Sequence, residues 1–445
     1  MFTLRSPNPA SARGVLRRDC LRIGGLGLCG LTLADVLRSD AAAGAARRTK
    51  SVIYIVLNGG PSHIDMWDLK PHAPTEYRGP FQPIATSLPG VEICEHMPRQ
   101  AALMDRLALL RGIRSVENDH YLSEVYTGLP RTSGARPAFG SVVSRAAAAP
   151  GLLPYVSLSA VQSPPFEYEN PHYAGAGHAP FRPFEEAVED LSPPADRAAF
   201  ENRRQLLRSL DRLLPEESCA ELFRGTDRFQ ARALEMLMSS RVRDALDVSQ
   251  EPEETLRRYG HRAGQYPHQT VKSILYDWDA KPFVQARRLV EAGVRVVTLQ
   301  VAAWDHHSGP ESDIFFALRR LMPLLDVSFT ALCEDLDERG LTDDVLVVML
   351  GEFGRTPRIS ELGPGREHWA DAGCAVLFGG GLKTGQVIGR TDARAERSIE
   401  GRTTFQSVLA TIYTVLGIDP ASTLPDFQGR PQLLLDDPDP IRELV

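Results

Sequence analysis

Cysteine is scarce in this chain, which has six cysteines among 445 residues. Cys20 and Cys29 lie near the amino terminus, and the other four are far apart, at positions 94, 219, 333 and 374. This spacing matches neither a zinc-binding module nor the dense cysteine framework of a small secreted domain. We therefore expect mostly buried, apolar cysteines, with one disulfide permitted after export.

The chain also lacks an apolar run of the roughly 20 residues that a membrane-spanning helix needs. Its most apolar segment, "LRIGGLGLCGLTLADVL", lies near the amino terminus, is short and contains Asp35. A basic region precedes this segment and the small residues Ala43-Gly44-Ala45 follow it, which is the layout of a cleavable export signal. Arg17-Arg18, just before the apolar segment, is typical of a twin-arginine leader.

We therefore predict that residues 1–46 are a twin-arginine-type export signal and that residues 47–445 form a single periplasmic or secreted domain. No stable membrane span is expected after signal cleavage. Two other interpretations stay open for this segment. One is lipidation at Cys29, although the bulky Leu28 precedes it, and the other is an amphipathic amino-terminal helix packed on the body.

Basic residues are in short supply beyond the leader. The whole chain has a net charge of −7, but residues 1–50 carry nine basic and three acidic side chains. The remaining 41 basic and 54 acidic side chains give the body a charge of −13. Because affinity for nucleic acid depends on neutralising phosphates with lysine and arginine, we expect no nucleic-acid partner.

Two common catalytic and cofactor motifs are missing as well. The sequence contains no Gly-x-Ser-x-Gly element, which excludes the usual nucleophile turn of a Ser-His-Asp ester hydrolase. The glycine-rich "FGGGLKTG" follows an apolar run but precedes no helical pattern, so it does not fit a dinucleotide-binding turn.

The sequence does contain a regular alternation of apolar runs and helical patterns. Continuous runs rich in Val, Ile and Leu are typical of strands buried on both faces of a parallel sheet. Amphipathic segments that end at glycine are typical of the helices between such strands. The expected strands are 51–58, 107–113, 154–159, 294–301, 344–351 and 374–380, and the expected helices are 281–293, 312–340 and 403–417.

This order of elements predicts an α/β fold with a mostly parallel central sheet and helices on both faces. The stretch 195–262 differs, because it is charged, strongly helical and without strand patterns, so we predict a helical insertion there. The proline-rich segment 162–184 is expected to be an irregular connecting loop.

Side chains that bind metals or act as acids and bases occur next to five of the expected strands. In an open α/β sheet, ligands collect at the carboxyl ends of the strands. The relevant residues are His63 and Asp65 after 51–58, Asn118, Asp119 and His120 after 107–113, Asp305, His306 and His307 after 294–301, Glu352 and Arg355 after 344–351, and Glu367 and His368 before 374–380.

Each of these groups has an ordinary explanation when it is taken alone. His63 with Asp65 suits a turn or cap, Asp305 with His307 suits a polar turn, and His368 suits a half-buried, hydrogen-bonded histidine. Taken together they indicate a metal site, because sheet geometry gathers the strand ends at one edge. Imidazole with carboxylate is the ligand set of zinc, manganese or iron.

Several motifs resemble the large bacterial domain-of-unknown-function family 1501, and the resemblance covers nearly the whole chain. They include "LNGGPSHIDMWDLKP", "NDHYLSEVYTGLP", "VTLQVAAWDHHSG", "LVVMLGEFGRTPRI" and "GREHW". That family is placed with the alkaline-phosphatase-like superfamily, which includes sulfatases and metal-dependent phosphomutases. The resemblance implies an alkaline-phosphatase-like fold and a metal site at the sheet edge that hydrolyses or transfers phosphate or sulfate esters.

The resemblance also implies which residues hold the metal. Asp305 with His307 (or His306) and the later His368 match positions of the superfamily, and Glu352 matches an acidic position whose neighbouring histidine is replaced here by Phe353. Asn58-Gly59-Gly60 stands where sulfatases have adjacent acids, so His63 and Asp65 would substitute. The expected cofactor is one or two divalent ions, zinc, manganese or calcium, bound by His63, Asp65, Asp305, His307, Glu352 and His368.

The expected nucleophile of a sulfatase is missing. Sulfatases place a modified Cys or Ser in a Cys/Ser-x-Pro-x-Arg motif ahead of a segment that "YTGLPRT" resembles. The corresponding position falls near Asn118-Asp119-His120, which contains neither residue. Formylglycine chemistry is therefore disfavoured, and water could attack directly with His120 as base or ligand.

The favoured hypothesis is an exported metal-dependent hydrolase of phosphate or sulfate esters, acting on a small-molecule or polysaccharide anionic ester. Asn118, His120 and Arg355 are its expected catalytic residues, with Arg355 or His120 orienting the substrate anion. Two alternatives remain: a non-catalytic exported binding protein on the same fold, for instance for polysaccharide, and a purely structural metal site. Every hypothesis with a metal requires the ligand atoms to converge, roughly 2–2.5 Å from a common point.

Overall fold

The structure is a computed structural model that describes residues 50–146, 153–159, 168–183, 240–302, 304–361, 363–401 and 403–445. The predicted export signal (1–46) and most of the predicted helical insertion (195–239) lie outside the described residues. Within the described part, no helix is long and apolar enough to cross a membrane.

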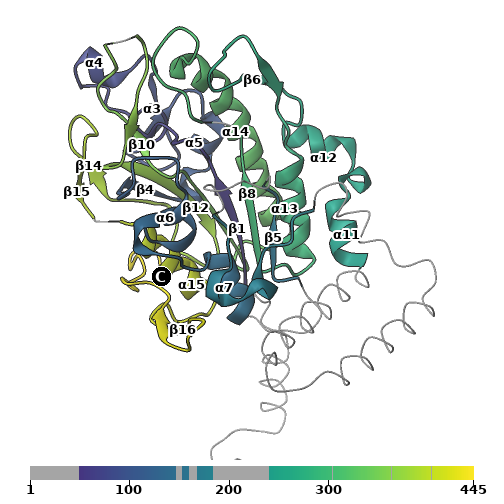
Figure 1. The fold of residues 1–445 in the computed structure, drawn as a ribbon. Coiled ribbons are helices and arrows are strands. Elements are labelled where there is room, and N and C mark those ends of the chain that lie inside the picture. Colours follow the sequence, from purple (N-terminus) through teal and green to yellow (C-terminus); the bar gives the residue numbers. More distant parts are fainter. Residues whose placement is uncertain are drawn as a thin grey trace, which may run out of the picture. The chain divides into compact units, whose positions relative to one another are not determined.

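A seven-stranded sheet forms the centre of the described domain (Figure 1). Its strand order is β13-β4-β12-β9-β1-β8-β5. Strand β12 pairs antiparallel with both of its neighbours, and the other four pairings are parallel. The strands are β1 (Ser51–Val56), β4 (Leu107–Ile113), β5 (Tyr155–Ser157), β8 (Val296–Gln300), β9 (Val345–Leu350), β12 (Gly373–Gly379) and β13 (Gln386–Ile388).

Both faces of this sheet are buried, as the continuous apolar runs predict. In β1, Ile53 and Ile55 belong to one apolar core, and Val52, Tyr54 and Val56 belong to the other. Helices α13 (Lys281–Glu291) and α14 (Ile314–Glu338) contribute to the first core. Helices α7 (Phe139–Ala146) and α15 (Phe405–Val415) contribute to the second, with α6 (Ser123–Thr127) beside them.

The predicted α/β class, with a mostly parallel sheet and helices on both faces, is therefore confirmed. All six expected strands and all three expected helices are present, with bounds that differ from the predicted ones by a few residues. Local capping explains the helix starts. Asp313 accepts a hydrogen bond from the Phe316 N–H at the start of α14, and Thr404 forms a capping box with Ser407 at the start of α15.

The other described elements are short. They matter because several of them hold the loops at one edge of the sheet. The strand pairs are β2 (Pro83–Ala85) with β3 (Glu92–Cys94), β6 (Gln265–Pro267) with β7 (Leu275–Asp277), β10 (Gly354–Arg355) with β11 (His368–Trp369), β14 (Arg390–Thr391) with β15 (Ser398–Glu400) and β16 (Thr423–Pro425) with β17 (Pro431–Leu433). The short helices are α3 (His63–Met66), α4 (Thr75–Arg78), α5 (Pro98–Ala102), α11 (Ser240–Leu246) and α12 (Glu253–Arg258). The 3-10 turns lie at Met104–Arg106, Arg131–Ser133, His172–Ala174, Ala176–His178 and Val248–Gln250.

The antiparallel strand β12 decides which loops meet. Because β12 runs against its neighbours, its first residue, Gly373, pairs with Ile113 at the end of β4. Ala375 likewise pairs with Leu350 at the end of β9. The segment that precedes β12 therefore lies at the same edge as the segments that follow β1, β4, β8 and β9.

Candidate metal centre

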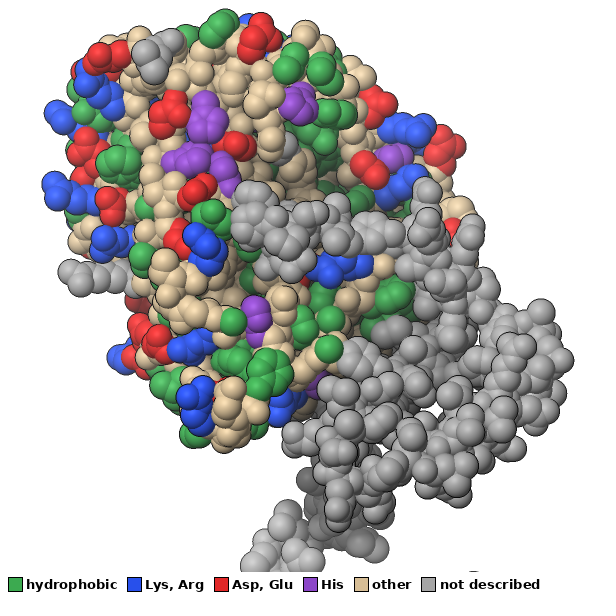
Figure 2. Space-filling view, in the orientation of Figure 1, with side chains coloured by type: hydrophobic (Ala, Val, Ile, Leu, Met, Phe, Trp, Pro, Cys, Tyr) green, Lys and Arg blue, Asp and Glu red, His purple; other side chains and the backbone are tan. Residues whose placement is uncertain are grey.

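Four metal-binding side chains from three segments converge at this edge. His120 precedes α6, Asp305 and His307 follow β8, and His368 lies in β11. One ligand atom from each residue lies within 4.8 Å of the corresponding atoms of the other three. Figure 2 shows histidine side chains gathered beside acidic side chains on one face of the molecule.

The three imidazoles direct the same ring nitrogen toward one carboxylate oxygen. The Nε2 atoms of His120, His307 and His368 lie 3.1, 2.7 and 3.6 Å from Asp305 Oδ1. Nε2 of His120 and of His368 is buried and makes no hydrogen bond of good geometry with any described residue. Because buried polar atoms normally make well-formed hydrogen bonds, these two nitrogens indicate that the site fits a metal ion.

The opposite ring nitrogens are held from outside the cluster. Nδ1 of His120 lies 2.9 Å from Glu352 Oε1, and Nδ1 of His307 lies 2.5 Å from Glu367 Oε2. Nδ1 of His368 lies 3.1 Å from the backbone carbonyl oxygen of Asn118. In a neutral imidazole, an acceptor at Nδ1 holds the proton there and leaves the Nε2 lone pair free, which is the usual support of metal-binding histidines.

Asp305 carries the negative charge at the centre of the cluster. Burial alone would raise the pKa of Asp305, but the neighbouring imidazoles of His120, His307 and His368 and the Arg355 guanidinium hold it well below its usual range. Burial lowers the pKa of His120, yet without an ion in the site the nearby carboxylates of Asp305 and Glu352 raise it overall to about 9. The surroundings of Asp305 therefore favour positive charge.

The backbone after β1 brings Asp305 into place. The Trp304 N–H donates to the Asn58 carbonyl oxygen at 2.9 Å. Gly59 has a φ of +113°, and a Cβ on it would come within 2.2 Å of the Asp305 backbone nitrogen. A side chain at position 59 is thus excluded by both the backbone conformation and the close approach of the loop after β8.

A family model described as "Protein of unknown function (DUF1501)" matches residues 49–445. The chain belongs to this family. A search of the curated proteins found no match.

Solved structures similar to this DUF1501 chain include a sulfatase from Pseudoalteromonas sp., with 10% identity and a TM-score of 0.37 over 86% of this chain and 70% of that one. They also include the integral membrane lipooligosaccharide phosphoethanolamine transferase A from Neisseria meningitidis, with 10% identity and a TM-score of 0.36 over 90% and 64%. The C-terminal periplasmic domain of EcEptC from Escherichia coli, in complex with zinc, gives 8% identity and a TM-score of 0.36 over 90% and 93%.

The residues predicted to bind metal fall into two groups. Asp305, His307 and His368 come together, and His120, predicted as a base or a ligand, joins them. Glu352 lies behind His120, where it is 2% exposed and accepts a hydrogen bond from the Gly59 N–H at 2.8 Å. Its Oε2 is buried without a hydrogen-bond partner among the described residues.

His63 and Asp65 belong to α3 and are not part of the cluster. His63 is buried, and its Nε2 lies 3.0 Å from the Ala395 carbonyl oxygen. Asp65 is fully buried in an ion pair with Arg366, whose Nε lies 2.7 Å from Asp65 Oδ2. The neighbouring His306 is also outside the cluster and buried, and burial lowers its pKa to about 4.

The two remaining predicted catalytic residues support the cluster. Arg355 is fully buried and does not face the solvent from which a substrate arrives. Its guanidinium donates to Asp305 Oδ1 at 2.8 Å and to the Gly60 carbonyl oxygen at 2.8 Å, and it also donates to the Gly59 carbonyl oxygen. Asn118 contributes its backbone carbonyl oxygen to His368.

Glu367 was predicted to lie at this edge, but no role was predicted for it. In the structure its carboxylate bridges Nδ1 of His307 and the hydroxyl of Ser308, both at 2.5 Å. The signal that could have found it is its position directly before His368, on the segment that brings this ligand to the edge.

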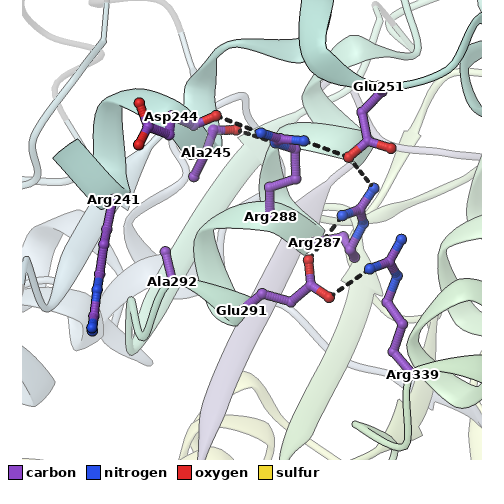
Figure 3. A pocket seen from close by; sticks show the side chains of 9 residues that line it. All are labelled: Arg241, Asp244, Ala245, Glu251, Arg287, Arg288, Glu291, Ala292 and Arg339. Atoms are coloured by element: carbon purple, nitrogen blue, oxygen red, sulfur yellow. Dashed lines mark hydrogen bonds and ion pairs between the residues drawn. The ribbon is translucent and has the colours of Figure 1, made fainter.

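A cavity of about 500 Å³ lies elsewhere, between α11, α13 and the end of α14 (Figure 3). Its helices α13 and α14 end just before β8 and β9 begin, so it lies at the sheet edge opposite the metal cluster. Its arginines and acids pair with one another, for instance Arg288 with Glu251 at 2.5 Å and Arg339 with Glu291 at 2.9 Å. The cavity therefore has the character of a structural ion-pair network.

Proposed function

We propose that the chain is an exported, metal-dependent hydrolase of phosphate or sulfate esters that uses one divalent ion. The ion would be held by His120, Asp305, His307 and His368. The observation that supports this most strongly is the common direction of three Nε2 atoms toward Asp305, combined with an acceptor at each Nδ1.

The ligand chemistry favours zinc or another transition metal over calcium. Calcium takes six to eight oxygen ligands, whereas this cluster offers three imidazole nitrogens and one carboxylate. Such a set suits zinc, manganese or iron. Among the described residues this is the one group of at least three such side chains with ligand atoms close enough to hold an ion, which supports a single ion.

Solvent can reach the cluster, as catalysis requires. The side chains of His120, Asp305, His307 and His368 are between 20% and 30% exposed. When bound, a divalent ion lowers the pKa of a water molecule and stabilises charge that develops on a phosphoryl or sulfuryl oxygen. Glu352 and Glu367 hold the imidazole rings in the orientation that this role needs.

The described cysteines are excluded as nucleophiles. Cys94, Cys333 and Cys374 are buried. Burial raises the pKa of the Cys94 thiol to about 12 and also raises the pKa values of the other two thiols, and a thiol is a poor nucleophile without its thiolate form. In the proposed reaction, water forms the new bond to phosphorus or sulfur, and the alcohol leaves with a proton.

The test is an assay of the zinc- or manganese-loaded full chain against a panel of aryl phosphate and aryl sulfate esters. We expect metal-dependent release of the phenol, which His368→Ala abolishes. His72→Ala, at an exposed histidine outside the cluster, is the matched control and should keep full activity. Stoichiometric metal without turnover on either ester class would overturn the hydrolase proposal.

A second candidate is a purely structural metal site, and the number of ligands favours it. Four protein ligands can fill a tetrahedral zinc site, whereas catalytic zinc sites keep a position open. The absorption spectrum of the cobalt-substituted chain separates the two. A five-coordinate spectrum that changes when phosphate or sulfate is added supports the hydrolase, and an invariant tetrahedral spectrum supports the structural site.

A further inference from the structure

Arg366 forms a buried, two-pronged ion pair with Asp65, 301 residues away in the sequence. Its Nε lies 2.7 Å from Asp65 Oδ2 and its Nη2 lies 3.0 Å from Asp65 Oδ1. Both side chains are fully buried. The Ser62 hydroxyl donates to Asp65 Oδ2 at 2.5 Å, so the carboxylate is fixed within α3 as well.

The rest of the Arg366 guanidinium is bound to backbone carbonyl oxygens. Nη1 donates to Thr356 at 3.0 Å and also to Pro357, and Nη2 donates to Tyr77 at 2.7 Å. These acceptors lie just after β10 and within α4. One side chain thus joins the segment after β1, the segment after β9 and the segment that carries His368.

The residues that follow Arg366 are two members of the metal centre. Glu367 holds His307, and His368 is a ligand. In the backbone, the Thr356 N–H donates to the Glu367 carbonyl oxygen at 2.7 Å, and His368 pairs with Arg355 in the β10–β11 ladder. Because Arg366 is anchored, the two residues that follow it, Glu367 and His368, have little freedom to change position.

We propose that Asp65 and Arg366 form a positioning clamp that sets the places of Glu367 and His368 in the metal centre. Neither residue touches the ion. The clamp rests on the proposed metal site, and it gives Asp65 a positioning role in place of the ligand role that the sequence indicates. Its loss shifts His368 away from the point where the three Nε2 atoms converge.

Two features argue for positioning beyond general stability. A buried ion pair contributes little net stability compared with apolar side chains of the same volume, because desolvation offsets the attraction. The carbonyl contacts require a planar fork of five N–H groups, which lysine cannot supply. Arg366→Lys therefore keeps the positive charge but removes the planar arrangement of N–H donors.

The ion pair of Arg287 with Glu251 is a matched control on the same chain (Figure 3). It is also buried, with Arg287 Nη2 2.8 Å from Glu251 Oε1 and side chains 2% and 8% exposed. It lies at the opposite edge of the sheet. Glu251→Gln weakens the ion pairs of Glu251 with Arg287 and Arg288 without touching the loops of the metal centre.

The experiment measures zinc affinity by competition with a chromophoric chelator, and the cobalt absorption spectrum, for the full chain. The variants are Asp65→Asn, Arg366→Lys and Glu251→Gln, with urea unfolding of each metal-free protein. We expect both clamp variants to bind zinc about 10- to 100-fold more weakly and to have an altered cobalt spectrum. Glu251→Gln should lower stability but keep the wild-type affinity and spectrum.

The clamp would be overturned if both clamp variants kept the wild-type zinc affinity and cobalt spectrum, or if Glu251→Gln lost as much zinc affinity as they do. A loss of zinc affinity in Asp65→Asn but not in Arg366→Lys would also overturn it, because Asp65 would then be a ligand. If a single variant fails to fold, the double variant Asp65→Leu/Arg366→Leu removes the pair without leaving an unpaired buried charge, and the same predictions apply to it. Absence of metal binding by the wild-type chain would instead refute the metal centre itself.

Discussion

Two histidines with similar sequence contexts should respond to mutation in opposite ways. His63 and His368 both lie next to a strand of the central sheet. In the structure His368 belongs to the metal cluster, whereas His63 is buried in α3 against Ala395 and the backbone of Arg355. His368→Ala should weaken metal binding, and His63→Ala should weaken the fold.

The expected size of each effect follows from the contacts. Structural zinc sites with four ligands bind with about 10–16 kcal/mol, so one ligand accounts for roughly 2.5–4 kcal/mol, or about 10²- to 10³-fold in affinity. His63→Ala leaves a cavity and an unpaired carbonyl group, which should lower the free energy of unfolding by about 2–4 kcal/mol. Because His368 is 20% exposed and at the edge, its loss should cost the metal-free fold less than about 1 kcal/mol.

Chelator competition measures the first effect, and urea unfolding of the metal-free protein measures the second. The account predicts a crossed pattern: a large affinity loss with little change in stability for His368→Ala, and the reverse for His63→Ala. Equal loss of zinc affinity in both variants would refute the assignment of His63 to a structural role.

Three further predictions concern the support of the site and of the fold. Glu367→Gln removes the carboxylate that holds His307, so zinc affinity should fall about 10- to 100-fold in the same competition assay; an unchanged affinity would contradict this support. Gly60→Ala places a Cβ 2.3 Å from the Phe353 ring at a φ of +72°, which should lower the free energy of unfolding by about 1–3 kcal/mol in urea. Burial raises the pKa of Asp326 from 3.8 to about 6, so the folded state holds this proton more tightly than the unfolded state does. The stability that the protonated carboxyl contributes below about pH 4 is lost as the pH rises through 6, by up to about 3 kcal/mol. The unfolding free energy of the wild type, minus that of Asp326→Asn, should therefore decrease from pH 4 to pH 7. A difference that stays constant over this range would contradict the shift.

The sheet could be predicted well because its strands carry their signal locally. The segment 107–113 matches β4 residue for residue, since a strand buried on both faces is a continuous apolar run. Strand β13 was not predicted, because its three residues become a strand through pairing with β4. The reversed direction of β12 is also invisible in the sequence, since an apolar run reads the same in either orientation.

The metal centre could be predicted in part, for the same physical reason. Strand ends meet at one edge, which was enough to bring Asp305, His307 and His368 together in the prediction. The same rule included Asp65, but its partner Arg366 lies 301 residues away, and no local pattern reveals such a pair. His120 was predicted as a base or a ligand, because the choice between the two depends on the orientation of the ring.

The central claim is that one ion is held by three imidazoles and one carboxylate at the edge of the sheet. Anomalous diffraction at the zinc absorption edge, from crystals of the zinc-loaded full chain, tests it most directly. The account predicts a single strong peak with the Nε2 atoms of His120, His307 and His368 at about 2.0–2.1 Å and a carboxylate oxygen of Asp305 at about 2.0–2.2 Å. A peak beside His63 and Asp65, or no peak at the four-residue cluster, would contradict it.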